Sequence, residues 1–193
     1  NNFINFKKLE LFLSDNIFKI EKLTGKFIKN ISLIIEDNEI SNINFGIKKK
    51  NYDTIISKKY LENTVIDAKD LFKENYKNEK IMHVIIKSFL INDKYYKIYE
   101  DDLIGDYLCL EINIISISHD LSSEIEKIFQ KFEIKISKYL DKKYINNFFD
   151  EENLELSNMA YKIQTGINLN EVNLVPKKSI KTGIFEKFFQ LFS

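Results

Sequence analysis

Hydrophobic positions change their spacing several times along the 193-residue chain, and each change predicts a new secondary-structure element. Between residues 7 and 24, apolar side chains recur every three or four positions, as on one buried face of a helix, and Gly25 follows as a stop signal. These side chains are Leu9, Phe12, Leu13, Ile17, Ile20 and Leu23. A second helix is predicted after Ser57, an N-cap residue, because apolar positions recur at the same period up to Phe72.

Alternation of apolar and polar residues predicts the strands. Residues 31–35 and 43–47 both alternate and flank an Asp37-Asn38 turn signal, a pattern that predicts a β-hairpin. Two longer strands are predicted over residues 80–92 and 107–118, joined by a connection that turns at Gly105. Another short strand begins at Ile134.

Two later helices complete the pattern. Residues 120–132 place five apolar side chains at helical spacing behind Asp120, and a helix over about residues 154–165 ends at Gly166. The order of elements predicts an α+β fold, with helices packed on a mostly antiparallel sheet. We divide the chain into an α+β domain (residues 1–140), a helical extension with a linker (141–176) and a tail (177–193).

The tail has the pattern of a short amphipathic helix. It contains four lysines and one glutamate, a local charge of about +3 that would attract anionic lipid. A helix lying in the membrane interface fits both its charge and its apolar stripe. The predicted membrane-binding residues are Lys181, Ile184, Phe185, Lys187, Phe188, Phe189, Leu191 and Phe192.

Two other locations for this helix remain open. It could dock on the core of its own domain, or it could occupy the groove of a partner protein. The segment is far shorter than the roughly 20 residues that span a bilayer. Since a helix of about three turns binds a membrane weakly, useful attachment would require several copies of the chain in an assembly.

Composition limits the classes of function. The 29 basic residues are all lysines and are balanced by 29 acidic residues, so no overall positive charge favours nucleic acid as a partner. Without arginine, the chain has no arginine finger and no bidentate clamp for phosphate or guanine. Cys109 is the only cysteine, which excludes a disulfide framework and a thiolate metal cage and is typical of a reducing cytoplasm.

Candidate catalytic groups are few. The five glycines are dispersed, so the closely spaced glycines of a phosphate-binding loop are absent. His119 beside Asp120 could form a base and its orienting carboxylate, although a turn histidine next to a helix cap is the simpler interpretation. His83 and Cys109 are expected to pack within strands. We therefore expect a protein that is not an enzyme and uses no metal or other cofactor.

A tyrosine-rich stretch is the candidate partner-binding patch. Tyr95, Tyr96 and Tyr99 lie close together in the connection between the two long strands. Aromatic residues are enriched in protein interfaces, and ordinary cross-strand packing is the alternative.

Several of these segments together resemble a known family. The residues concerned are 31–35 with the following hairpin, the run 80–91, and Ser118-His119-Asp120 leading through a helix to Glu133-Ile134-Lys135-Ile136. Their order resembles the SHS2-type 1C subdomain of FtsA, the actin-like bacterial cell-division family. That family also ends in a linker and a short membrane-targeting helix, and residues 183–192 are similar to it. The resemblance covers roughly residues 5–140 and 177–193.

The resemblance implies an SHS2-like fold and a scaffold on the inner face of the plasma membrane. Its partners would be division proteins or neighbouring protomers, together with an anionic membrane surface. ATP binding is not implied, because this chain lacks the glycine-rich loops of the actin-like subdomains. Contact with FtsZ is not carried over either, because in the family it belongs to a lobe that the resemblance does not cover. A soluble interaction module whose C-terminal helix docks on its own core is the alternative function.

Overall fold

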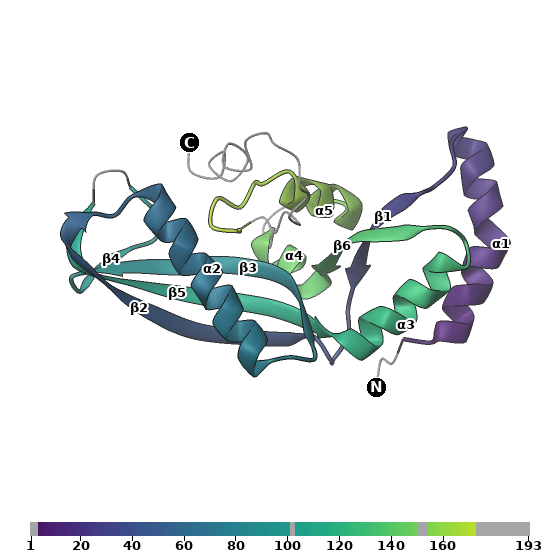
Figure 1. Cartoon of the computed structure of the whole chain (residues 1–193). Coiled ribbons are helices and arrows are strands. Elements are labelled where there is room, and N and C mark those ends of the chain that lie inside the picture. The colour runs from purple at the N-terminus through teal and green to yellow at the C-terminus, as the bar shows by residue number, and fades with distance from the viewer. Residues whose placement is uncertain (1–3, 101–102, 150–153, 173–193) are drawn as a thin grey trace, which may run out of the picture. The chain divides into compact units, whose positions relative to one another are not determined.

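A computed structural model describes residues 4–100, 103–149 and 154–172. These residues form five α-helices and six strands, which confirms the α+β class (Figure 1). The chain divides into two compact units that interleave along the sequence. The first unit comprises Asn1–Ser41, Asn78–Met82 and Ser116–Ala160, and the second comprises Asn42–Lys77, His83–Ile115 and Tyr161–Ser193.

The first unit contains α1 (Phe6–Thr24), β1 (Asn30–Ile35), α3 (His119–Gln130), β6 (Lys135–Asp141) and α4 (Lys142–Phe148). Strands β1 and β6 pair in parallel, from Asn30 opposite Lys135 to Ile35 opposite Asp141. Asn5 caps the N-terminus of α1, since its side chain accepts a hydrogen bond from the Lys8 amide. It ends at Gly25, where a φ of 67° gives the left-handed cap that glycine adopts without steric cost.

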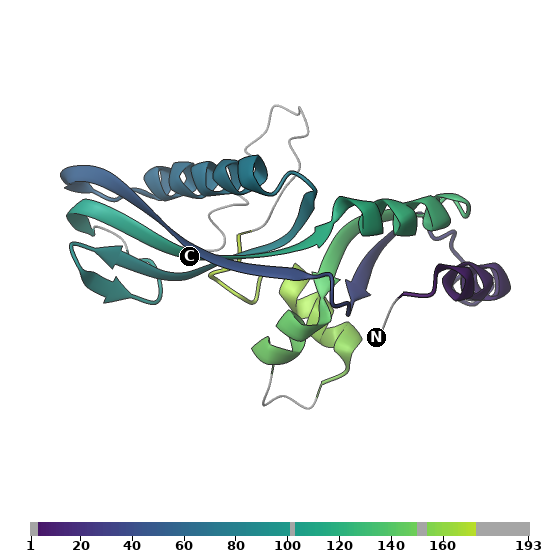
Figure 2. The same cartoon turned by 90° about the horizontal axis from the view of Figure 1, so that it is seen from below.

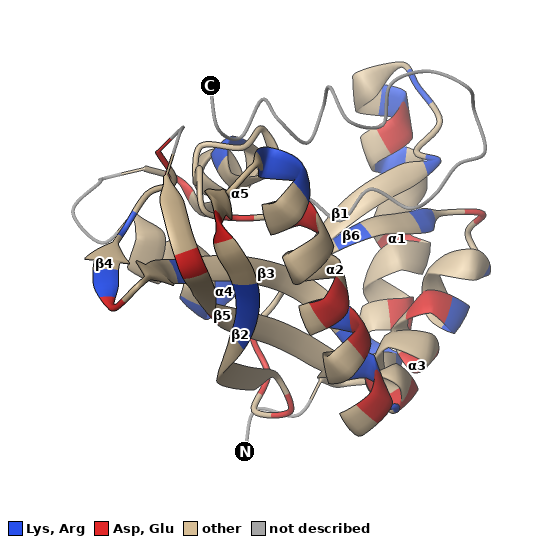
Figure 3. Ribbon diagram, turned by 60° about the vertical axis from the view of Figure 1, so that its left-hand side comes forward, with Lys and Arg blue, Asp and Glu red and all other residues tan. Residues whose placement is uncertain are grey.

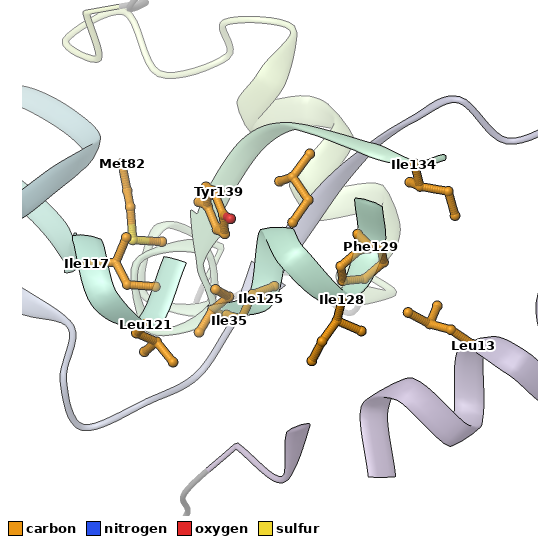
Figure 4. Close-up of a cluster of buried hydrophobic side chains, with 11 residues drawn as sticks. Leu13, Ile35, Met82, Ile117, Leu121, Ile125, Ile128, Phe129, Ile134 and Tyr139 are labelled. Atoms are coloured by element: carbon orange, nitrogen blue, oxygen red, sulfur yellow. The ribbon is translucent and has the colours of Figure 1, made fainter. Parts of the chain in front are cut away.

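The core of the first unit lies between its helices and the β1–β6 pair (Figure 4). Helix α3 contributes Ile125, which is fully buried, and the edge of α1 contributes Leu13. The whole cluster consists of Leu13, Ile35, Met82, Ile117, Leu121, Ile125, Ile128, Phe129, Ile134, Ile136 and Tyr139. Burial of this apolar area supplies most of the stabilisation of the unit.

The second unit is built on a four-stranded antiparallel sheet in the order β2-β5-β3-β4. Its strands are β2 (Ser41–Ile55), β3 (Glu79–Ile91), β4 (Lys94–Tyr96) and β5 (Ile104–Ser118), and parts of β3 and β5 belong to the first unit. Helix α2 (Lys58–Asn75) lies along one face of the sheet (Figure 2). It buries Leu61, Val65, Ala68 and Phe72, whose spacing of four, three and four positions is the helical period predicted for this segment.

A final segment follows α5 (Leu156–Gln164) and binds to the edge of β3. The Ile86 amide donates to the Asn170 carbonyl oxygen at 2.9 Å, and the Val172 amide donates to the Val84 carbonyl oxygen at 2.8 Å. Residues 170–172 thus act as a short additional strand, with Glu171 opposite Ile85 in an antiparallel bridge.

The predicted hairpin over residues 31–35 and 43–47 is wrong. The turn itself forms, since the Glu39 amide donates to the Asp37 side chain at 2.8 Å. The flanking strands then enter different sheets, β1 with β6 and β2 with β5. Local alternation predicts that a strand exists but not which strand it pairs with. The short β4 and α4 were not predicted, and the expected C-terminal helix lies outside the described residues.

Candidate interaction surfaces

The predicted membrane-binding residues of the tail lie outside the described part of the chain. They are Lys181, Ile184, Phe185, Lys187, Phe188, Phe189, Leu191 and Phe192. Their role stays a prediction from the sequence. Among the described residues, no helix combines the length and apolar character needed to cross a bilayer.

The predicted tyrosine patch divides into surface and core residues. Tyr95 is 57% exposed, and Tyr96 is half-buried. Tyr99 is buried: its hydroxyl donates to the Ile56 carbonyl oxygen at 2.8 Å, and its ring centroid lies 6.2 Å from that of Phe89. A buried phenol that is packed and hydrogen-bonded serves the core. Only Tyr95 and part of Tyr96 are therefore available at the surface.

A second group of tyrosines, with two lysines, lies on the sheet of the second unit. The Lys48 Nζ is 4.5 Å from the centroid of the Tyr107 ring. The Lys50 Nζ is 4.9 Å from the Tyr52 ring centroid and 5.9 Å from that of Tyr107. These distances are within the range of cation–π attraction. We call Lys48, Lys50, Tyr52 and Tyr107 the lysine–tyrosine cluster.

The cluster lies on the face of the sheet opposite α2. Lys49, the residue between the two cluster lysines, forms an ion pair with Asp67 of α2. Because successive side chains of a strand point to opposite faces, Lys48 and Lys50 point away from the helix. Both are exposed, so this side of β2 presents two ammonium groups to solvent.

A tight turn holds Tyr52 outward at the end of the cluster. Tyr52 and Asp53 have φ values of 54° and 51°, a left-handed conformation that is uncommon for residues other than glycine. The buried Asn51 stabilises the turn, because its Nδ2 donates to the carbonyl oxygens of Thr54 (2.6 Å) and Gly105 (3.0 Å). Such conformations persist where the surroundings enforce them and are frequent at binding sites. Tyr52 remains 72% exposed.

Sequence reasoning missed the lysine–tyrosine cluster. Tyr107 belongs to β5, and the other three residues belong to β2 or its end, so the cluster exists only after the two strands pair. The one available signal was the spacing of Lys48, Lys50 and Tyr52 at every second position, which places them on one face of a strand.

Cys109 and the histidines occupy structural positions. Burial, reinforced by the nearby Glu111 carboxylate, raises the pKa of the Cys109 thiol and disfavours the reactive thiolate. His83 is buried, and its Nδ1 lies 2.8 Å from the Glu171 Oε1. His119 begins α3, and the neighbouring Asp120 accepts a hydrogen bond from the Asn78 Nδ2 at 3.1 Å. This geometry adds no support for a catalytic His119–Asp120 pair.

A pocket of about 270 Å³ lies in the first unit at the beginning of α3. It is lined by four carboxylate residues and three apolar residues: Asp37, Glu39, Asp120, Glu124, Ile4, Phe6 and Leu121. Within the described residues, no three metal-binding side chains converge closely enough to hold an ion. The buried Asp37 carboxylate is already engaged by the Glu39 amide.

Helix α1 exposes large apolar side chains on its outer side. The predicted single buried face is wrong in part, because only Leu13 of that set is fully buried. Phe12 is 59% exposed and Leu23 is 86% exposed, and two residues outside the predicted set, Leu11 and Phe18, are also exposed. The helix has apolar residues on nearly all sides, so periodicity could not identify which side faces the core. Exposed apolar surface of this kind usually marks an interaction site.

No protein-family model matches this chain, and no curated protein sequence matches it.

Proposed function

We propose that this chain is a non-catalytic, membrane-associated scaffold of bacterial cell division. It recruits division proteins or neighbouring protomers through its α+β body and attaches to the inner face of the plasma membrane through the predicted C-terminal helix. The cell-division setting comes from the resemblance to the FtsA family. The observation that carries the recruiting role is the lysine–tyrosine cluster on the face of the sheet opposite α2.

The cluster has the chemistry of a site for acidic protein segments. Two ammonium groups and the phenol groups of Tyr52 and Tyr107 offer several hydrogen-bond donors to carboxylates. The tyrosine rings attract the Lys48 and Lys50 ammonium groups, which favours the arrangement that a partner would meet. Such a surface favours acidic partners and gives a salt-sensitive association rate.

Attachment through residues 177–193 supplies the second half of the proposal. We expect the tail to bind the membrane reversibly, because its positive charge is small and its apolar stripe is short. A scaffold that concentrates many copies at one place converts such weak contacts into stable attachment.

Localisation in living cells tests the proposal. A fluorescent fusion of the full chain should concentrate at the division site. Phe188→Asp in the tail should release it into the cytoplasm. Lys48→Glu with Lys50→Glu should leave the fusion on the membrane but distribute it evenly along the membrane instead of at the division site. Lys73→Glu, on α2, with Lys77→Glu, just after its end, controls for net charge, because both lysines are exposed. Uniform distribution of the wild-type fusion would refute the proposal.

The soluble interaction module remains the second candidate. Its C-terminal helix would pack on the body of the chain instead of on lipid. Removing residues 181–193 should then lower the melting temperature by several degrees, whereas loss of a membrane anchor should leave it almost unchanged.

A further inference from the structure

We infer that the outer face of α1 is a second membrane-binding surface that binds bilayers containing anionic lipid. The inference rests on the proposed membrane attachment and extends it to a different part of the chain. It is drawn from the exposed fractions and the charges of the α1 side chains; Figure 1 shows the course of α1, and Figure 3 colours the charged positions.

Four large apolar side chains form two ridges on this face. Leu11 and Phe18 are seven positions apart and lie on one side, with exposed fractions of 55% and 72%. Phe12 and Leu23 are eleven positions apart and lie on the other side, with exposed fractions of 59% and 86%. Phe27, just beyond the helix, is 82% exposed. Leaving so much apolar surface in water is costly unless another phase or molecule covers it.

Lysines occupy the strip between the two ridges. Lys8, Lys19 and Lys22 are all exposed there, and Asp15 is the one acidic residue of α1 on this strip. The other two acidic residues of the helix are engaged elsewhere. The Glu10 Oε1 lies 2.6 Å from the Lys131 Nζ, and the Glu21 Oε1 accepts a hydrogen bond from the Ile28 amide at 2.9 Å. The outer face is therefore positively charged.

The charge favours a bilayer over a second copy of the chain. Two copies that meet through this face would bring their lysines together, and like charges across an interface oppose association. Anionic lipid headgroups would neutralise the lysine charges. The flexible lysine stems can bend toward the headgroups while the neighbouring phenylalanine and leucine side chains enter the acyl boundary.

Helix α1 is already folded before it meets a membrane. Its N-terminus is capped by Asn5, its C-terminus by Gly25, and its inner side packs on the core through Leu13. A peptide that folds only at the interface loses conformational entropy on binding, and α1 avoids that loss. The same chemistry, phenylalanine and leucine among lysines, recurs in residues 177–193. Two weak sites in one chain would strengthen attachment together and limit how the body is oriented on the surface.

Vesicle sedimentation of the full chain tests the inference. Phe18→Asp with Leu23→Asp should weaken binding to vesicles of equal phosphatidylcholine and phosphatidylglycerol by about tenfold or more, from the lost apolar burial. Lys19→Glu with Lys22→Glu should weaken the same binding, with less effect at high salt. Leu71→Asp is the matched control, because Leu71 of α2 is 46% exposed and should leave binding unchanged. Circular dichroism verifies that each variant is folded.

The outcomes separate this inference from the proposed function. If Phe188→Asp abolishes binding while folded α1 variants bind as wild type, the inference is overturned and tail attachment stands. If the wild-type chain stays in the supernatant with anionic vesicles, both are overturned. If the α1 substitutions change only the oligomeric state measured by light scattering, the face is a protein interface and the inference is again overturned.

Discussion

The Nδ1 of His83 and the Oε1 of Glu171 lie 2.8 Å apart, with both side chains buried. His83 belongs to β3, and Glu171 belongs to the segment that follows α5. The contact therefore joins positions 88 residues apart and fastens that segment to the sheet beside its two backbone hydrogen bonds.

Removing the carboxylate should weaken this attachment. Glu171→Ala is expected to lower the free energy of unfolding by about 1–3 kcal/mol, the usual result of removing one partner from a buried polar contact. Amide hydrogen exchange at Val172 and Ile86 should accelerate as the segment detaches more often. Glu171→Gln is the control, because its amide oxygen can still accept a hydrogen bond. Equal losses for the two variants would contradict a specific His83–Glu171 contact.

Two glycines of the sheet should respond differently to an added methyl group. At Gly105, a Cβ would overlap the Cγ2 of Ile91, a buried side chain. At Gly46, a Cβ would meet the Cys109 Sγ at 3.7 Å, an ordinary van der Waals contact. Gly105→Ala should therefore cost about 1–3 kcal/mol through overpacking, whereas Gly46→Ala should be nearly neutral. Urea denaturation measures both, and a neutral Gly105→Ala would refute the close packing at that strand.

Local features of the fold could be predicted because their causes lie within a few residues. The Ser57 cap, the apolar stripe of α2 and the left-handed Gly25 depend on neighbouring positions only. The pairing of β1 with β6 depends on segments about a hundred residues apart, so alternation alone led to the wrong hairpin.

The candidate surfaces were hard to predict for the same reason. The lysine–tyrosine cluster requires β2 beside β5, and nothing near Lys48 indicates that Tyr107 will be its neighbour. On α1, apolar residues surround the helix, so the exposure of Phe18 follows from which side α3 and β6 happen to cover. Tyr99 was placed in the surface patch because its buried partner, the Ile56 carbonyl, lies in a distant loop.

Glu62 is expected to destabilise the fold at neutral pH. It is buried on α2, and its Oε1 has no hydrogen-bond partner among the described residues. Burial raises the pKa of Glu62, with Lys59 acting in the opposite direction. Glu62→Met should therefore increase the free energy of unfolding at pH 7 by about 1 kcal/mol, since it removes an unsatisfied buried group.

The pH dependence of the free energy of unfolding is the control for the Glu62→Met prediction. A carboxyl group whose folded pKa is raised opposes folding above that pKa, and the cost vanishes as the pH falls and the group becomes protonated. The gain from Glu62→Met should thus be smaller in acid than at pH 7, as measured by urea denaturation. A loss of stability at neutral pH would show that Glu62 has a stabilising partner.

Glu126 should have the opposite pH dependence. Burial acts to raise the pKa of Glu126, but hydrogen bonds from Lys80 and from the Tyr139 hydroxyl, at 3.0 Å, together lower it. A lowered folded pKa means that the carboxylate stabilises the fold above its unfolded pKa, and that this contribution disappears as the pH falls through the folded pKa. Glu126→Gln should cost up to about 1 kcal/mol at pH 7, because the Lys80 ion pair is partly exposed to solvent. In acid, the wild type and the variant should converge in free energy of unfolding. A difference that persists at low pH would mean that Glu126 acts through its packing instead of its charge.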